Sequence, residues 1–307
     1  MLKKLLTVLL LAAFCLTMLP PPALAARLDQ TPLDKTATVE KLLYGSEQDG
    51  SLMDRIAKLE KDLFGIPGKE ALMAKVDRIY TYVRESSPAA PSMVFKISSL
   101  EWSLTQSVSH GPLKPRLETL EKTVGGMVGI GSLDSRVSRL MSLTFSASKP
   151  QATQVTLNKD SLIKIRTITP LDSKLSKTGD AVDFEVMDDV YVSGMLVIAK
   201  GAKGTGKITK SEPAQNFGRD AKLEVSFDNV EAFDMTIVGT VLGDKAKEET
   251  RSLATAAGAS VVGLILLGPI GVVGAAFVHG KNFTVPAGTQ LYIQTQADVE
   301  LVGLTVK

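Results

Sequence analysis

The sequence predicts an α+β protein of two domains: a helical array, then an all-β barrel or sandwich. Up to residue 145, apolar residues recur at helical spacing in units of about 20 residues. Beyond residue 158, they alternate with polar residues, which is typical of strands. An uncharged, glycine-rich stretch at residues 252–280 interrupts this second half. We expect that stretch to form an apolar helical hairpin inserted into the β domain.

Residues 1–25 are expected to be a secretory signal peptide. Lys3 and Lys4 form a basic start, residues 5–19 form an apolar core, and Ala23-Leu24-Ala25 is a small-residue cleavage site. A membrane-crossing helix needs about 20 apolar residues, and this run is shorter. We therefore expect an exported protein of the periplasm, the outer membrane or the cell surface. Residues 26–38 are expected to be a linker.

A repeat of about 20 residues is expected at residues 39–145. The pattern Leu-x-x-basic-aliphatic-x-x-Leu/Ile occurs five times, and Gly or Pro residues separate the units. Its apolar positions share one face of a helix, so each unit predicts a helix of about 12–15 residues and a short turn. The basic position holds Arg55, Lys75, Lys96, Arg116 and Arg136.

Two interpretations of this basic position remain open. The five side chains could form a ladder of charge that contacts a cell-wall polymer or a protein partner. Alternatively, they flank the buried stripe and extend their charged ends into water. Units such as Leu59-Glu60-Lys61-Asp62-Leu63-Phe64-Gly65 resemble short LE-x-x-LFG repeats of uncharacterised exported bacterial proteins. That resemblance covers residues 39–143 and implies no activity.

Residues 159–307 are expected to form the β domain, after a polar linker at 146–158. Val182, Phe184 and Val186 alternate with acidic residues, as strand residues with one buried face do. Further β-rich runs lie at residues 162–168, 191–199, 223–227, 235–241 and 290–295. Six to eight short strands without helices between them favour a compact barrel or sandwich.

Several short motifs of the second half follow one another in a particular order. They include Gly179-Asp180-Ala181-Val182, Leu196-Val197-Ile198-Ala199-Lys200-Gly201 and Val285-Pro286-Ala287-Gly288-Thr289. This order resembles the C-terminal β-barrel of TrbI-like proteins of conjugation and type IV secretion channels. The resemblance covers about residues 160–305. It implies a barrel whose apolar helical insertion crosses the outer membrane in an assembled ring.

The uncharged stretch at 252–280 allows two interpretations. Small residues recur in it at the spacing that lets helices pack closely, on both sides of a Gly-Pro break. These residues are Thr255, Ala259, Gly263, Gly268, Pro269, Gly271 and Ala275. They favour contact with a membrane or with further copies of the chain. The alternative is a buried hairpin packed over the barrel.

The charge balance argues against a nucleic-acid partner. From Arg27 onward the chain holds 33 basic and 33 acidic residues, because Lys3 and Lys4 account for the excess. A nucleic-acid-binding protein normally carries a visible basic excess. Self-association, membrane contact through 252–280 and a cell-wall or envelope protein partner remain the expected interactions.

The sequence predicts no catalytic residue, no cofactor and no metal site. The stretch 201–207 begins like a P-loop, but Ile208 stands where a Ser or Thr should bind magnesium. Asp188-Asp189 lacks further ligands at calcium-loop spacing, and neither His110 nor His279 has an acid and a nucleophile beside it in sequence. We therefore expect a non-enzymatic structural or assembly protein of the cell envelope. The alternative is a soluble periplasmic or surface binding module that uses the repeats.

Overall fold

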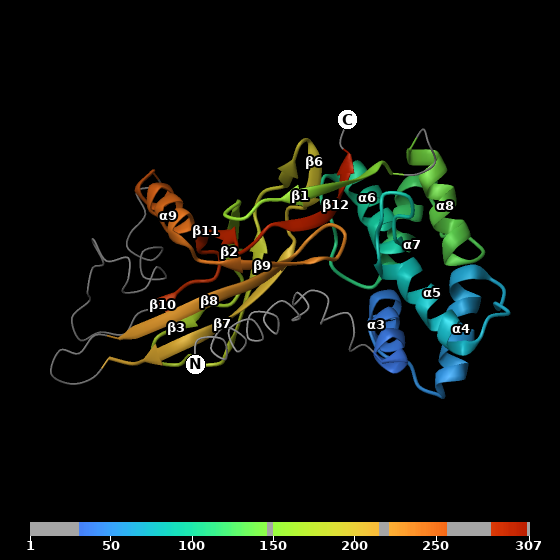
Figure 1. Cartoon of the computed structure of the whole chain (residues 1–307), viewed down its shortest axis with the longest axis horizontal. Coiled ribbons are helices and arrows are strands. Elements are labelled where there is room, and N and C mark those ends of the chain that lie inside the picture. The colour runs from blue at the N-terminus through green and yellow to red at the C-terminus, as the bar shows by residue number, and fades with distance from the viewer. Residues whose placement is uncertain (1–30, 146–149, 215–220, 257–283, 306–307) are drawn as a thin grey trace, which may run out of the picture.

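The computed structural model describes residues 31–145, 150–214, 221–256 and 284–305. It confirms the α+β architecture of two parts, a helical array and a region that contains a closed barrel (Figure 1). The helices of the array are α3 (Pro32–Tyr44), α4 (Leu52–Phe64), α5 (Leu72–Arg84), α6 (Met93–Thr105), α7 (Leu113–Gly125) and α8 (Leu133–Thr144).

Local sequence signals set the ends of these helices. The side chains of Ser51, Ser92 and Ser132 each accept a backbone N–H three residues on, which satisfies a free donor of the first turn. Helix α3 starts at Pro32, so the linker expected at 26–38 was wrong for residues 32–38, and residues 26–30 lie outside the described residues. The reason is a capping box between Thr31 and Asp34 together with proline in the first turn, and both signals favour a helix start there.

The β region consists of twelve described strands. They are β1 (Ala152–Leu157), β2 (Leu162–Thr167), β3 (Leu171–Asp172), β4 (Ala181–Val186), β5 (Val190–Val192), β6 (Met195–Ile198), β7 (Lys203–Glu212), β8 (Lys222–Glu231), β9 (Ile237–Val241), β10 (Thr284–Val285), β11 (Gln290–Thr295) and β12 (Val299–Thr305). The linker expected at 146–158 was wrong for residues 152–157, because Ala152–Leu157 forms β1 and pairs with β12.

Six strands close into a barrel in the order β11-β2-β4-β7-β8-β9, and β1-β12-β6-β5 form a second sheet. The barrel core contains Phe184 and Phe227, whose ring centroids lie 5.4 Å apart. The alternating pattern at 182–186 is therefore confirmed as a strand with one buried face. The run at 191–199 is a hairpin, because Ser193 and Gly194 both adopt positive φ between β5 and β6.

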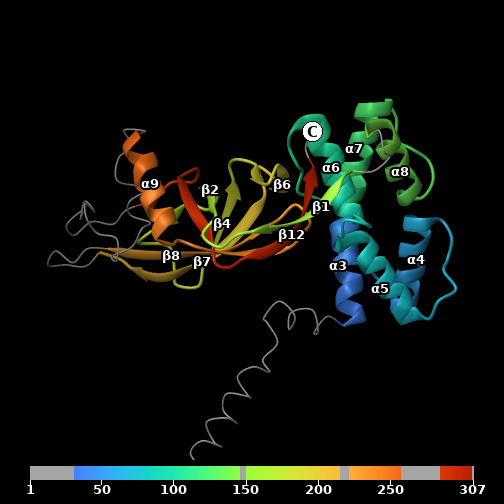
Figure 2. The same cartoon turned by 45° about the horizontal axis from the view of Figure 1, so that its top comes forward.

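Helix α9 (Asp244–Ala256) completes the barrel at its weakest seam. Strands β9 and β11 pair at only two positions. Where that pairing stops, the Thr250 hydroxyl accepts the backbone N–H of Tyr292 at 2.9 Å, and the Gln294 side chain accepts the N–H of Ala246 at 3.1 Å. A strand N–H that lacks a strand partner is thus satisfied by a helix. Figure 2 shows α9 beside the barrel.

The uncharged stretch is only partly described. Residues 252–256 form the end of α9, a helix that begins at Asp244 among charged residues and that the strand-only expectation missed. Residues 257–280 lie outside the described residues, so the hairpin stays a prediction. Within the described ranges, none of the helices has both the length and the apolar composition needed to cross a membrane.

The glycines of the P-loop-like stretch have a packing role in the barrel. A Cβ on Gly204 would lie 2.1 Å from the Phe184 ring, and a Cβ on Gly206 would lie 1.9 Å from the backbone oxygen of Ser226. Both glycines are buried in β7. They let the β8 backbone and the core ring approach β7 closely, as glycines within strands often do.

We predict that Gly206→Ala destabilises the barrel by about 3 kcal/mol or more, because the new methyl group collides with backbone that cannot move aside. Urea unfolding followed by circular dichroism measures the loss. The matched control is Gly125→Ala in α7, where a Cβ meets nothing within 4 Å. Equal stability of the two variants would contradict this account.

Candidate functional site

The predicted basic positions lie in a repeated ion pair between consecutive units. In four units the base contacts a glutamate 15 residues earlier, near the end of the preceding helix. The pairs are Arg55–Glu40 at 2.6 Å, Lys75–Glu60 at 2.8 Å, Arg116–Glu101 at 2.7 Å and Arg136–Glu121 at 2.6 Å. The same carboxylates accept a backbone N–H eight residues on, from Gln48, Gly68 and Ser109.

Each glutamate therefore fixes the following turn and the following helix together. The expectation that the charged ends reach water or a partner was wrong for the arginines, because Arg55 and Arg136 are only 8% exposed. Burial by itself raises the pKa of the Glu121 carboxyl. The Arg136 guanidinium and the N–H of Gly129 outweigh burial and leave that pKa below its usual value.

The third unit lacks this pair. Tyr80 occupies the glutamate position, and Lys96 instead lies with its Nζ 5.1 Å from the centre of the Tyr82 ring. Burial lowers the pKa of Lys96, and the charge of Asp134 partly opposes that effect. The hydroxyl of Tyr82 donates to Asp134 of α8 at 2.5 Å. A cation–π contact thus replaces the ion pair between α5 and α6.

Helix α6 joins the helical array to the β region. Met93, Ile97 and Leu100 on one side belong to the core of the array. Phe95 and Trp102 on another side pack with Phe233 and with strands β6 and β12. The rings of Phe95 and Phe233 are 5.1 Å apart, edge to face. The two parts therefore share a continuous apolar interface.

Hydrogen bonds surround this apolar interface. The Trp102 indole N–H donates to Asp189 at 3.0 Å, and Asp189 also accepts the Tyr191 hydroxyl and the backbone N–H of Lys200. Asp189 is thus fully used in the fold. No group of three or more His, Cys, Asp or Glu residues within the described ranges is placed to hold a metal ion.

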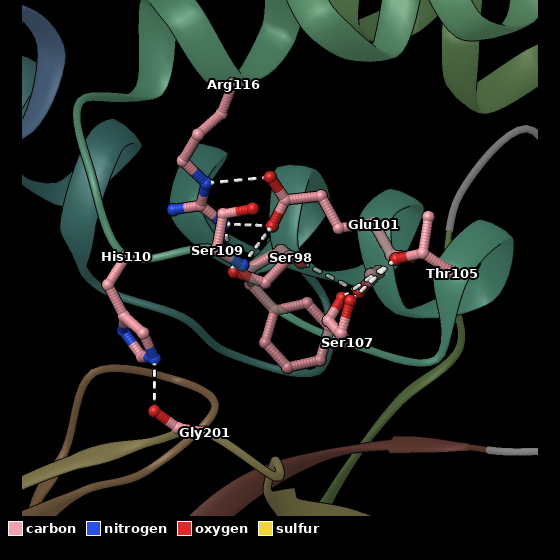
Figure 3. Close-up of polar contacts among 10 residues, drawn as sticks. Ser98, Glu101, Thr105, Ser107, Ser109, His110, Arg116 and Gly201 are labelled. Atoms are coloured by element: carbon pink, nitrogen blue, oxygen red, sulfur yellow. Dashed lines mark hydrogen bonds and ion pairs between the residues drawn. The ribbon is translucent and has the colours of Figure 1, made fainter. Parts of the chain in front are cut away.

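His110 links the α6–α7 turn to the β6–β7 turn. Its Nε2 donates to the carbonyl oxygen of Gly201 at 2.5 Å (Figure 3). Figure 3 also shows Arg116 reaching Glu101 and Ser98 just behind this turn. Burial lowers the pKa of His110, and Lys203 and Arg116 lower it further, whereas the Gly201 carbonyl opposes them. The neutral imidazole is therefore the form that suits the junction.

A cavity of about 530 Å³ lies beside this contact. Helices α3 and α6, the α6–α7 turn, the β6–β7 turn and the β8–β9 turn line it. Its apolar wall includes Leu42, Val94, Val108 and Phe233. Glu231, the last residue of β8, is half-buried and reaches the same cavity. Burial raises the pKa of Glu231, although the charges of Arg84 and Arg116 lower it.

Of the small residues predicted as membrane or oligomer contacts, only Thr255 lies within the described residues. Thr255 lies in the helical backbone of α9. Ala259, Gly263, Gly268, Pro269, Gly271 and Ala275 lie outside the described residues, so their role stays a prediction.

Sequence reasoning missed the junction, although the sequence carries a signal for it. Trp102 is the only tryptophan of the chain. It occupies a repeat position that holds Lys41, Lys61 or Thr81 in the preceding units. An aromatic residue on the polar face of one unit indicates that this unit buries a second face.

Among known proteins, one solved structure shows a weak similarity to the chain. No protein-family model matches the chain, and no curated protein matches it. A solved structure of ComB10 of the Com type IV secretion system of Helicobacter pylori is similar, with 16% identity and a TM-score of 0.27. The alignment covers 47% of this chain and 90% of that chain. A similarity this low says nothing about what this chain does.

We predict that Arg136→Leu lowers the stability of the helical array by about 3 kcal/mol, because it leaves the buried Glu121 carboxylate without its cation. The double variant with Glu121→Leu should lose less than the single variant. Arg139→Leu, at an exposed position of the same helix, is the control and should change little. Chemical denaturation of all three tests this, and a loss for Arg139→Leu as large as for Arg136→Leu would refute it.

We predict that the junction weakens as the pH falls from 7.5 through 6.5, the ordinary pKa of histidine. The folded pKa of His110 is lowered, so the unfolded chain binds the proton first and acid shifts the balance towards unfolding. Melting temperatures at several pH values measure this. His110→Gln keeps a donor for Gly201 but cannot titrate, so it should reduce the change in melting temperature between pH 7.5 and pH 6.5. The control His279→Gln should leave that change as it is in the unaltered protein.

Proposed function

We propose that this chain is a non-enzymatic structural or assembly protein of the bacterial cell envelope. In this proposal the barrel is a rigid base, the repeats extend from it, and the 252–280 stretch mediates membrane association or contact between copies. The observation that carries the proposal is the shared interface at α6, which joins the two parts into one body.

The internal use of the repeated charges supports a scaffold. Four of the five predicted basic positions pair with glutamates of the neighbouring unit, and each glutamate holds a turn as well. Such couples define the geometry between consecutive helices. They therefore suit a protein that holds a fixed shape.

The attachment of α9 supports a role for the stretch that follows it. Thr250 and Ala246 bind α9 to β11 of the barrel, so the helix that precedes residues 257–280 is held against the barrel. A contact made by residues 257–280 would thus be transmitted to the barrel wall. Small residues spaced by four in this stretch suit close helix packing.

A soluble binding module that recognises cell-wall polymer or a protein partner through the repeats is the second candidate. The observation that favours it is a set of exposed apolar residues in the turns of the array, among them Ile66, Met127 and Ile130. Exposed apolar groups of this kind occur at interaction sites.

We predict that the intact protein sediments with membranes as a large oligomer, and that a variant lacking residues 257–280 is small and soluble. This deletion keeps α9 and its contacts with β11. Fractionation of the native host, then detergent extraction and size measurement with light scattering, provides the readout.

Point variants separate packing from general apolarity. Gly263→Leu with Gly271→Leu should reduce the oligomer, whereas Val262→Leu should not, because only the glycines allow close backbone approach. If intact and deleted proteins are both soluble monomers, the assembly proposal fails. Binding of that monomer to isolated cell wall, and its loss with Ile130→Ser, would then establish the second candidate.

A further inference from the structure

Three turns of the array begin in the same way but differ in their side chains. Gly45, Gly65 and Gly126 each adopt positive φ at the end of a helix. Each glycine donates its backbone N–H to the carbonyl oxygen of a lysine four residues earlier: Lys41, Lys61 and Lys122, respectively. The three turns are therefore equivalent, and their side chains can be compared position by position.

The first turn is polar, whereas the other two expose large apolar residues. After Gly45 the chain continues with Ser, Glu, Gln and Asp, and Lys41 pairs with Glu47 at 2.8 Å. In the second and third turns the apolar side chains point into solvent. Their exposed fractions are 73% for Ile66, 74% for Met127 and 99% for Ile130.

The two apolar turns lie side by side in the fold. A Cβ on Gly65, where the α4–α5 turn begins, would lie 3.7 Å from the Cβ of Ser132, where the α7–α8 turn ends. Both views show these turns on the side of the array away from the barrel (Figures 1 and 2). We define the apolar tip as the exposed residues of these two turns: Ile66, Met127, Val128 and Ile130.

The charged groups around the apolar tip leave a positive surface. Lys61, Lys69 and Lys122 are exposed, and none of them makes a hydrogen bond or an ion pair with a described residue. The polar turn differs here as well, because its lysine is neutralised by Glu47. Arg139 of α8 is a further exposed cation.

The acidic side chains near the apolar tip are used inside the array. Most are held by a base or a hydroxyl of a described residue: Glu60 by Lys75, Glu70 by Arg78, Glu121 by Arg136 and Asp134 by Tyr82. Glu118 of α7 acts on the buried Arg136. A partner of the tip should therefore combine an apolar phase with anionic groups.

We propose that the apolar tip binds the surface of a lipid bilayer that is rich in anionic lipids. Ile66, Met127 and Ile130 enter the boundary between head groups and acyl chains, and the three free lysines contact the lipid phosphates. Protruding aliphatic side chains suit a soft apolar medium, and lysines beside them are attracted to anionic head groups.

This surface is separate from residues 252–280, so the inference goes beyond the assembly role proposed above. A contact made by a few side chains is weak and reversible, unlike the insertion of a helix. Removal of residues 257–280 should therefore still release the chain from membranes during fractionation.

A single fluorescent label tests the proposal on the mature chain, which contains no cysteine after residue 25. An NBD group, whose emission moves to shorter wavelength in apolar surroundings, is attached to Ile130→Cys or to Asp49→Cys, the equivalent position of the polar turn. Both positions are exposed, so neither change disturbs a core. With vesicles of phosphatidylcholine and phosphatidylglycerol, we expect a shift at position 130 and none at position 49.

Charge variants and lipid composition test the role of the lysines. Lys61→Glu with Lys122→Glu should raise the lipid concentration needed for half of the shift by at least about tenfold. Vesicles of phosphatidylcholine alone should have an effect of similar size. The control Lys114→Glu, at an exposed position near the start of α7, should change nothing.

Cosedimentation of the labelled chain with the vesicles separates this inference from the assembly role. Vesicle binding without a shift at position 130 would overturn the inference and leave the assembly role standing, whereas no vesicle binding at all would contradict both. Equal shifts at both labels, or a shift that ignores charge reversal, would also overturn it. A shift caused by isolated cell wall or by lipid-free protein, but not by vesicles, would assign the tip to another partner.

Discussion

Helix α6 must bury two faces at once. The position of the helical array against the β region depends on that constraint. One face completes the core of the array, and the other places Phe95 and Trp102 against Phe233 and the β12 side of the second sheet. Small Ser98 and Ser99 are buried between these faces. Because interiors are closely packed, such a helix cannot shift against one part without disturbing the other. The cavity and the His110 contact exist because this helix sets the distance between the array and the barrel.

Within the array, a recurring ion pair between a glutamate and the base of the next unit helps to specify how consecutive helices pack. A glutamate near the end of a helix holds the next turn through an N–H and the next helix through a base. Buried ion pairs add little net stability compared with apolar packing, but they penalise any arrangement that separates them. The ion pair is absent at two places. Tyr80 occupies the glutamate position in α5, where the Lys96–Tyr82 contact joins α5 and α6 instead. Met141 occupies it in the last unit, which has no following unit to bind.

The barrel has a different weak point, the pairing of β9 with β11 at only two positions. Strands β9 and β11 diverge after two paired positions, and α9 supplies the acceptor for Tyr292 and uses Gln294 to hold its own first turn. On the other side of residues 257–283, strand β10 pairs with β3 in a separate two-stranded sheet.

The sequence by itself determined the period of the repeat, the helices it encodes and the strand pattern of the second half, because apolar spacing and capping residues are local properties. It did not determine what the basic positions do: a base at every twentieth residue looks alike whether it faces water or a glutamate 15 residues earlier. Strand β1 and helix α9 were also missed. Strand β1 needs β12 nearly 150 residues later, and α9 needs the Tyr292 N–H that the short β9–β11 pairing leaves for Thr250. The junction and its cavity were decided only by tertiary structure, because they bring Glu231, His110 and α3 together from distant parts of the chain.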